Sequence, residues 1–252
     1  LIARAGNTEQ IERLLPDIVA GMPATVALME NGDWGDERVT CTIDDNGTLS
    51  GGKKYVSDAG AAKLFVVPVQ HKGALALAVV RSDQIASAAI SAHTLIDETK
   101  RAANVDFSGI SVEPENLFTG AAVSSALKDV RLIGALLVAA ETTGAAAACL
   151  DTIVEYLKTR KQFGKLIGSY QALKHPSAEI LTAVDSCRSF VYHAATLLGD
   201  AAIDRDTEIA CRMAKVQATD TLLYAGDRAV QFHGGMGFTY ECDAQLYIRR
   251  AQ

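Results

Sequence analysis

Two short segments of this sequence carry residue types that suit an anionic, planar ligand. The first runs from Thr159 to Gln171 and offers an arginine, a phenylalanine and two glutamines close together. Arginine binds phosphate groups through paired hydrogen bonds, an aromatic ring stacks on a planar group, and an amide donates and accepts hydrogen bonds. A structural interpretation is also open, because cations at the end of a helix favour its dipole and Gly164 is a natural stop.

The second segment, Gln231 to Phe238, is dense in glycine. Glycines let the backbone approach a ligand closely and turn N–H groups toward it. The same pattern is typical of an ordinary helix end, and His233 on its own is more often a capping residue than a base. Taken alone, each segment therefore leaves two interpretations open.

The composition limits the classes of partner. With 252 residues, of which 49% are hydrophobic and 21% charged, the chain has the composition of an ordinary soluble globular protein. Its net charge of −6 argues against nucleic acid as the main partner. The most apolar stretch, Leu132 to Leu150, contains Glu141 and many small residues, so a buried helix explains it better than a membrane span. We expect neither a nucleic acid nor a membrane as partner.

The cysteines indicate neither a disulfide framework nor a metal site. They are widely scattered, and none shows the C-x-x-C spacing of a metal-ligand pair. Reduced thiols in a cytoplasm are the expected state, so the predicted location is cytoplasmic and no metal is expected. The five stand at positions 41, 149, 187, 211 and 242.

The pattern of apolar residues changes near residue 120. From about residue 25 to residue 118, short β-like runs alternate with turn signals. Val39, Cys41 and Ile43, for example, alternate with polar residues as in a strand with one buried face. Several such strands without intervening helices predict a compact antiparallel sandwich or barrel.

The apolar residues after position 121 follow the helical period. Three long helices with short links predict an antiparallel bundle. The first of them has apolar residues on its opposite side as well, including Leu137 and Val138, so we expect it to be covered all round. The predicted core stripes are Leu132, Leu136, Ala139, Thr143, Ala147, Leu150, Val154 and Leu157, then Ile180, Val184, Cys187, Val191, Ala194 and Leu198, then Ile209, Met213, Val216, Leu223 and Val230.

Together and in this order, the two segments resemble the carboxyl-terminal signature of the acyl-CoA dehydrogenases. The matching stretches are RKQFG at 160–164, IGSYQALKH at 167–175 and QFHGGMG at 231–237. Upstream, the stretches ALME at 27–30 and GKKYVS at 52–57 are similar to the family's Ala-Leu-Thr-Glu and Gly-x-Lys-x-Trp-Ile-Thr segments. The resemblance covers nearly the whole chain, and its helical segments are the more specific part.

The resemblance implies an α+β fold, in which an antiparallel β barrel or sandwich domain is followed by an antiparallel four-helix bundle. Residues 1–24 would be a remnant of an amino-terminal helical domain, residues 25–120 the β domain, and residues 121–252 the bundle domain. Because the chain starts at Leu1 and stops inside an expected helix, we expect most of the amino-terminal domain and the extreme carboxyl terminus to be missing.

The resemblance also implies FAD as the cofactor. Four residues, Leu28, Met29, Tyr55 and Ser57, would line the flavin ring, although Met29 and Tyr55 replace the commoner Thr and Trp. The adenine and pyrophosphate end would reach a neighbouring subunit, and the family's completion of its flavin site across a dimer interface implies a homodimer or homotetramer. The residues that match this end are Arg160, Gln162, Phe163, Ile167, Tyr170, Gln171, Gln231, Gly234 and Gly235.

No catalytic residue follows from the resemblance. In most members the base that removes the substrate's α-proton is a Glu that would lie after Gln252, and in others it occupies the position of Gly134, which has no side chain. Glu141, two turns beyond Gly134 on the same face of the expected helix, is the local candidate. The alternative is a buried Glu held by a neighbouring Lys or Arg.

Three functions therefore stay open. The first is FAD-dependent α,β-dehydrogenation of an acyl-CoA thioester, with electrons passed to an electron-transfer flavoprotein. The second is an oxidase or monooxygenase relative, in which O₂ accepts the electrons. The third is a non-catalytic subunit of a hetero-oligomer that lends FAD contacts to an active partner.

Overall fold

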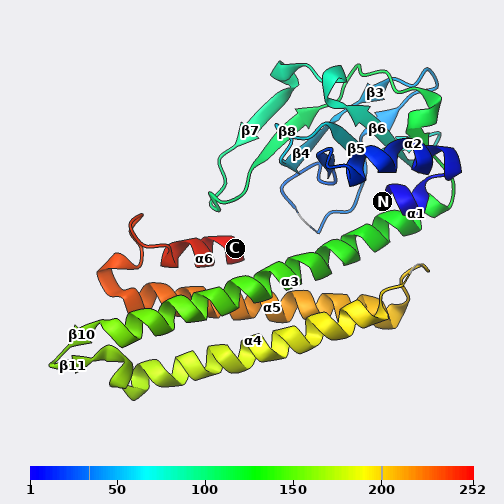
Figure 1. Cartoon of the computed structure of the whole chain (residues 1–252). Helices are drawn as coiled ribbons and strands as arrows, with labels where there is room; N and C mark the ends of the chain where they lie inside the picture. The colour runs from blue at the N-terminus through cyan, green and yellow to red at the C-terminus, as the bar shows by residue number, and fades with distance from the viewer. Residues whose placement is uncertain (34, 200) are drawn as a thin grey trace. The chain divides into compact units, whose positions relative to one another are not determined.

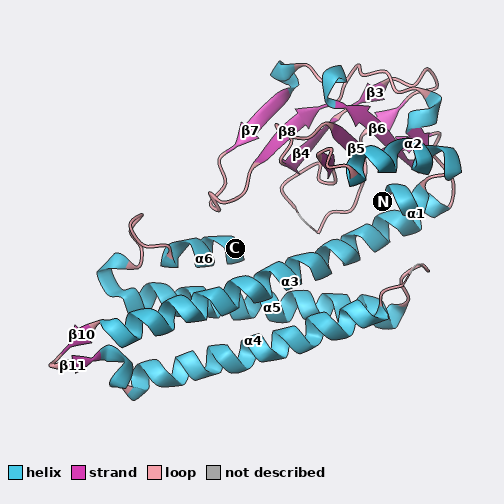
Figure 2. Ribbon diagram, in the orientation of Figure 1, coloured by secondary structure: helices cyan, strands magenta, loops and turns pink. Residues whose placement is uncertain are grey.

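The computed structural model describes residues 1–33, 35–199 and 201–252, which form two compact units, Leu1–Lys128 and Asp129–Gln252 (Figure 1). The first unit combines short helices with two β-sheets, and the second is almost entirely helical (Figure 2). The α+β class is thus confirmed. The expected three-part division at residues 24 and 120 stays a prediction.

The first unit begins with two helices, α1 (Ile2–Ala5) and α2 (Thr8–Val19). Asn7 caps α2: its side chain accepts a hydrogen bond from the backbone N–H of Gln10, and the Gln10 side chain accepts one from the N–H of Asn7. This reciprocal pair satisfies donors that the first helical turn would otherwise leave unpaired. The Gln10 amide also donates to the carbonyls of Glu115 and Leu117, which fixes α2 against the end of the β-structure.

Two sheets make up the rest of this unit. The larger has the strand order β3-β2-β5-β6-β9, with β1 paired to β5, and the smaller has the order β4-β8-β7. The larger sheet consists of β1 (Ala24–Val26), β2 (Thr42–Ile43), β3 (Leu49–Ser50), β5 (Leu64–His71), β6 (Ala74–Arg81) and β9 (Leu117–Phe118). The smaller sheet and the 3₁₀ turns consist of β4 (Gly52–Ser57), β7 (Ile90–His93), β8 (Ala102–Asp106), η1 (Ser82–Gln84), η2 (Ser87–Ala89) and η3 (Pro114–Asn116).

The expected closed antiparallel barrel is wrong, because both sheets are open. Among the described residues the ladders do not join into a ring, and the larger sheet is mixed, since β1 and β2 pair with β5 in parallel. Closure needs an unbroken, staggered ladder, which strands of two residues such as β3 and β9 do not supply. The sandwich alternative fits better, because one hydrophobic cluster takes Phe65 and Val67 from the larger sheet and Val56 and Val105 from the smaller.

Strand β5 is the centre of this unit and is buried on both faces. Phe65 and Val67 belong to the cluster between the sheets, whereas Leu64 and Val66 pack in a second cluster with residues of α1 and α2. Two covered faces explain why the strand reads as a continuous apolar run rather than an alternating one. Pro68 has no backbone N–H to donate. It is tolerated because an N–H at this position would point into the gap between Val66, the last residue paired with β1, and Gln70, which pairs with β2.

The second unit contains three long helices that run antiparallel to their neighbours (Figure 1). They are α3 (Ala122–Thr159, which starts in the first unit), α4 (Gln171–Leu197) and α5 (Arg205–His233), and the eight-residue α6 (Ala244–Ala251) follows. The expected four-helix bundle is therefore found in part, as three long helices and one short one in the described chain. The remaining elements are β10 (Lys161–Gln162), β11 (Lys165–Leu166), η4 (Ile167–Ser169) and η5 (Gly234–Met236).

The predicted core stripe of α5 is wrong. Ile209, Met213 and Val216 are 43%, 48% and 58% exposed, and the buried face of the helix consists mainly of alanine. Small side chains let two helices approach closely, so an alanine face buries well although its hydrophobicity is low. The buried face comprises Ala210, Cys211, Ala214, Ala218, Leu222, Ala225, Ala229 and Phe232.

The predicted stripes of the other two long helices are confirmed for most positions. Leu132, Leu136 and Ala139 of α3 pack with Cys187 and Ala194 of α4 and with α5. Helix α3 is not covered all round, however, because Leu137 and Val138 are exposed. By length and composition alone α3 could cross a membrane, a test that the core helix of a bundle also passes.

Candidate functional site

The first candidate segment folds as a tight hairpin between α3 and α4. Strands β10 and β11 pair through Gln162 and Lys165, so the turn consists of Phe163 and Gly164 alone. Both turn residues have positive φ, 52° and 81°, as a two-residue turn that matches the twist of its strands requires. Phenylalanine seldom adopts this conformation, and its side chain is 90% exposed. The fold thus holds an aromatic ring in water at the cost of local strain, which is a common property of binding sites.

Both candidate segments line one cavity of about 550 Å³ in the second unit. The hairpin and the start of α4 supply one side, and the end of α5 with η5 supplies the other. Seven of the predicted cofactor residues meet here, although the segments lie some 60 residues apart: Arg160, Gln162, Phe163, Ile167, Tyr170, Gly234 and Gly235. Gln171 and Gln231 do not line the cavity, and both are exposed.

The sequence alone did not identify several residues of this cavity. Tyr156 precedes Arg160 by one turn of α3, so the helical period was a signal that could have found it. His233 is buried and stacks on the Tyr156 ring, with 4.1 Å between centroids and 26° between planes. The other lining residues that were missed are Ala172, Leu173, Phe232 and Met236.

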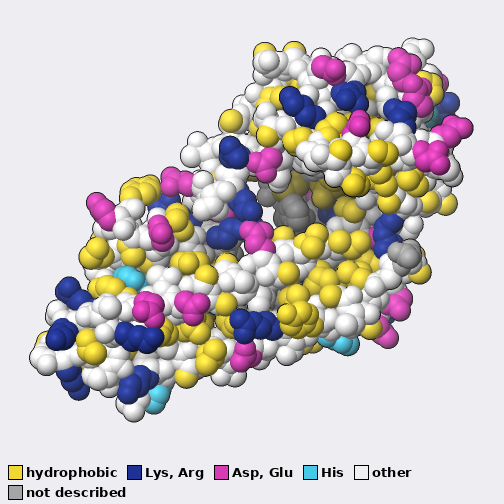
Figure 3. Space-filling model, viewed as in Figure 1, with side chains coloured by type: hydrophobic (Ala, Val, Ile, Leu, Met, Phe, Trp, Pro, Cys, Tyr) yellow, Lys and Arg dark blue, Asp and Glu magenta, His cyan; other side chains and the backbone are white. Residues whose placement is uncertain are grey.

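This end of the second unit is positively charged although the chain as a whole is acidic. Lys and Arg side chains gather around the hairpin (Figure 3). Among the described residues, the guanidinium of Arg160 has no ion pair, whereas Lys158 pairs with Glu155 at 2.8 Å. An unpaired guanidinium beside an apolar cavity favours an anionic ligand with a flat, apolar part. The cations at this end are Lys158, Arg160, Lys161, Lys165 and Lys174.

The four residues predicted for the flavin ring lie in two neighbouring segments of the first unit. The carbonyl of Met29 accepts a 2.7 Å hydrogen bond from the backbone N–H of Lys54, next to Tyr55. Tyr55 sits in a bulge of β4 with a φ of 52°, and its ring stacks on His93 at 4.5 Å. The carbonyl of Ser57 accepts a 2.9 Å hydrogen bond from the Thr25 hydroxyl. Leu28 and Met29 are half-buried, whereas Tyr55 and Ser57 are exposed.

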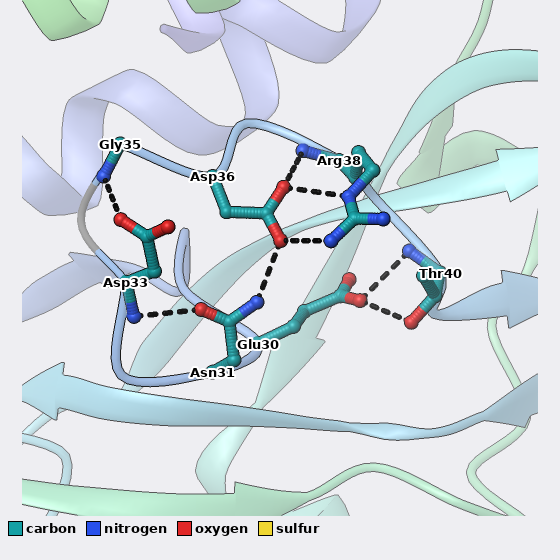
Figure 4. A network of polar contacts seen from close by, with 7 residues as sticks. All are labelled: Glu30, Asn31, Asp33, Gly35, Asp36, Arg38 and Thr40. Carbon is teal, nitrogen blue, oxygen red and sulfur yellow. Dashed lines mark hydrogen bonds and ion pairs between the residues drawn. The ribbon is translucent and has the colours of Figure 1, made fainter.

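A buried ion pair holds these two segments together from behind. Lys53, whose side chain is 0% exposed, donates to Glu30 at 2.6 Å. Glu30 also accepts hydrogen bonds from the Thr40 N–H and hydroxyl and from the Cys41 N–H, so it closes the base of the loop between residues 30 and 41 (Figure 4). Burial raises the pKa of Glu30, but the hydrogen bonds from Lys53, Thr40 and Cys41 outweigh it and leave the pKa below its ordinary value.

The same loop carries a second polar cluster around Asp36. Asp36 accepts hydrogen bonds from the Arg38 guanidinium and from the Asn31 amide (Figure 4). The Arg38 guanidinium and N–H, together with Asn31, hold the pKa of the Asp36 carboxyl far below its usual range. Because the Arg38 side chain is 83% exposed, this ion pair contributes little to the stability of the unit.

The local candidate for a catalytic base, Glu141, is engaged in an ion pair. The guanidinium of Arg250 in α6 donates two hydrogen bonds to Oε1 of Glu141, one from Nε at 3.2 Å and one from Nη2 at 3.1 Å. The Glu141 side chain is 48% exposed, so it is held by an arginine but is not buried. A Cβ atom added at Gly134 would have no atom within 4 Å, so there is space for a side chain at this position. The ion pair favours a structural role for Glu141, and no catalytic base is identified among the described residues.

Four of the cysteines are buried, and Cys242 is half-buried. Burial raises the pKa of Cys149 to about 12 and also raises those of Cys41, Cys187 and Cys211, which keeps their thiols protonated and unreactive. Within the described ranges there is no group of three or more His, Cys, Asp or Glu residues that could hold a metal ion.

Comparison with known proteins places these features in one family. The profile described as "Acyl-CoA dehydrogenase, C-terminal domain" matches residues 126–252. The acyl-CoA dehydrogenase IpdE2 of Mycolicibacterium smegmatis is 43% identical over 117 residues, which are 46% of this chain and 35% of that protein. The short/branched chain specific acyl-CoA dehydrogenase of Bos taurus mitochondria is 26% identical over 264 residues, which cover 100% of this chain and 60% of the relative.

A solved structure with the same fold extends over both units. The acyl-CoA dehydrogenase of Bacillus anthracis complexed with FAD superposes with a TM-score of 0.88 and 22% identity, covering 99% of this chain and 47% of that one. At this identity the likeness shows the fold alone. The chain spans between 35% and 60% of the length of the two curated relatives.

Proposed function

Because the chain belongs to the acyl-CoA dehydrogenase family, we propose that it serves in FAD-dependent α,β-dehydrogenation of an acyl-CoA thioester. One observation carries this proposal: the hairpin with Arg160 and the glycine segment, far apart in sequence, line one largely apolar cavity to which Arg160 brings a positive charge. Bound FAD would accept the hydride from the β-carbon of the substrate.

The residues of each unit fit one part of FAD. In the first unit, the exposed ring of Tyr55 and the hydroxyl of Ser57 suit the flat, polar flavin ring. In the second unit, Arg160 suits the pyrophosphate and the aromatic lining suits adenine. The ion pair between Glu30 and Lys53 would contribute to flavin binding indirectly, because it fixes the two backbone segments that carry Met29 and Tyr55.

We further propose that the chain assembles with copies of itself, as a homodimer or homotetramer, and passes electrons to an electron-transfer flavoprotein in the cytoplasm. Ile209, Met213 and Val216 are exposed and stand three or four positions apart on α5, and this apolar stripe supports self-association, because an exposed apolar surface of this kind usually marks an interface. By the family resemblance, the nucleotide end of one FAD would then be held by the second unit of a neighbouring copy.

One observation favours a second candidate function, a non-catalytic subunit of a hetero-oligomeric acyl-CoA dehydrogenase. Gly134 has no side chain at a family position for the base, and Glu141 is bound to Arg250. A subunit of this kind could keep the cavity, since the cavity would hold the flavin of its partner.

The full-length protein tests both candidates. Its visible spectrum shows whether FAD is bound, and anaerobic addition of a panel of acyl-CoA thioesters shows whether the flavin is reduced. Bleaching with one thioester supports the dehydrogenase, and fast return of colour in air would move the assignment to an oxidase or monooxygenase. Bound flavin that no thioester bleaches favours the non-catalytic subunit. A colourless protein that takes up no added FAD refutes both.

A further inference from the structure

The imidazole of His233 is fixed in one tautomer by the end of α5. Its Nδ1 lies 2.7 Å from the carbonyl oxygen of Ala229, one helical turn earlier. A carbonyl oxygen only accepts hydrogen bonds, so Nδ1 must carry the proton. In the neutral ring Nε2 is then unprotonated and can only accept a hydrogen bond.

This acceptor has no partner in the protein. Among the residues that the structure describes, no group forms a hydrogen bond with Nε2. The side chain is only 9% exposed, yet it lines the 550 Å³ cavity. The Tyr156 ring covers one face of the imidazole and keeps it from turning away. A rigid acceptor on the wall of an otherwise largely apolar cavity points to a ligand that offers a donor there.

The rest of the cavity indicates the chemical class of that ligand. Phe163 and Tyr170 offer aromatic faces, Ile167 and Leu173 are apolar, and Arg160 supplies one strong site for phosphate. A flat heterocycle with an amino group on its edge and a phosphate on its sugar combines these features. Nucleotides whose base carries an amino group meet this description, and adenine is the one that FAD supplies. Hypoxanthine nucleotides do not meet it, because their ring has a carbonyl in place of the 6-amino group.

We propose that His233 selects adenine in this cavity, by accepting at Nε2 a hydrogen bond from the 6-amino group of the base. The proposal rests on the cavity being the nucleotide end of the FAD site. FAD and CoA both carry adenine, so the source of the base has to be separated in the experiment.

The test compares FAD with its hypoxanthine analogue on the full-length protein stripped of flavin. A 6-oxo group would place an acceptor against Nε2, and a buried acceptor without a donor is strongly disfavoured. We expect the analogue to bind about 10- to 100-fold more weakly than FAD, as measured by quenching of flavin fluorescence.

Two variants of one residue separate hydrogen bonding from packing. In His233→Phe the ring still stacks on Tyr156 but the acceptor is lost, so the preference for FAD should fall to about twofold or less. His233→Gln places a carbonyl oxygen near the position of Nε2, so it should restore part of the preference. His193→Phe, at an exposed position of α4, is the matched control and should keep the full preference. Circular dichroism checks that each variant is folded.

Two results would overturn the inference while leaving the proposed function intact: wild-type protein that binds both flavins equally, or His233→Phe that keeps the preference. A protein that binds neither flavin overturns the proposed function as well. The same comparison with CoA and its hypoxanthine analogue identifies the source of the base. A preference seen only with CoA would overturn the proposal, because the cavity would then bind the substrate rather than FAD.

Discussion

Removing Glu30 from its ion pair with Lys53 should be one of the most destabilising single substitutions in the first unit. In Glu30→Ala the ammonium of Lys53, whose side chain is 0% exposed, would stay in the interior without its 2.6 Å partner. Removing one member of a buried pair typically costs about 3–5 kcal/mol. The loop would lose support too, because the N–H groups of Thr40 and Cys41 donate to the same carboxylate. We therefore expect Glu30→Ala to fall in the upper half of this range.

Urea unfolding followed by circular dichroism measures the effect. Asp45→Ala is the matched control, because Asp45 pairs with Lys72 at 3.2 Å in the same unit with both side chains exposed. An exposed pair contributes about 0–1 kcal/mol, so the control should remain close to wild type. In a double-mutant cycle, Glu30→Gln combined with Lys53→Met should be more stable than the sum of the single losses predicts. A loss below about 1 kcal/mol in Glu30→Ala would refute the argument from burial.

The pH dependence of this pair has a definite sign. The folded protein lowers the pKa of Glu30 below its ordinary value. Its contribution is therefore fully present above the unfolded pKa, which is about 4.3 for a glutamate, and is lost as the pH falls through the folded pKa. Relative to Glu30→Gln, the wild type should lose its advantage in acid. An advantage that grows below pH 4 would contradict the direction of the shift.

Three further variants test the bundle and the cavity. Arg160→Ala should weaken FAD binding roughly 10- to 100-fold, as a lost charged hydrogen bond does, while Arg212→Ala on the exposed side of α5 should leave flavin fluorescence titrations unchanged. Gly134→Glu should keep the fold and raise the free energy of unfolding in urea by up to about 1 kcal/mol, because a Cβ added at this position would meet no atom within 4 Å. The same variant should increase flavin bleaching by acyl-CoA if this position reaches the substrate. Met213→Asp should shift the protein toward monomer in analytical ultracentrifugation, whereas unchanged mass would count against α5 as an interface.

The local sequence determined the long helices, the β-rich character of the first unit and the two segments that line the cavity. The apolar period predicted the three long helices, since a helix that packs on others must repeat its buried residues every three or four positions. The segments Thr159–Gln171 and Gln231–Phe238 could also be recognised by their residue types. Seven of the predicted cofactor residues line the cavity. These properties depend on spacing along the chain, which the sequence contains directly.

The predictions from the sequence were wrong for features that depend on distances between elements. It favoured Ile209 and Met213 as the core of α5, because they are larger and more apolar than the alanines of the opposite face. Which face is buried depends on how closely α3 and α4 approach, and the small alanines of α5 allow a close approach. The barrel was wrong for a similar reason, since parallel pairing of β1 and β2 with β5 joins residues some 28 to 40 positions apart.

What the sequence by itself determined is the inventory: long helices, short strands, a segment with an arginine and a phenylalanine, and a glycine-rich segment. Only the tertiary structure decided which of these parts meet. It brought Arg160 and Gly234 to one cavity, stacked Tyr156 on His233 at the wall of that cavity, and joined Lys53 to Glu30 in the interior. The physical reason is that periodicity fixes which side of an element is apolar, whereas a contact between distant residues depends on the packing of every element between them.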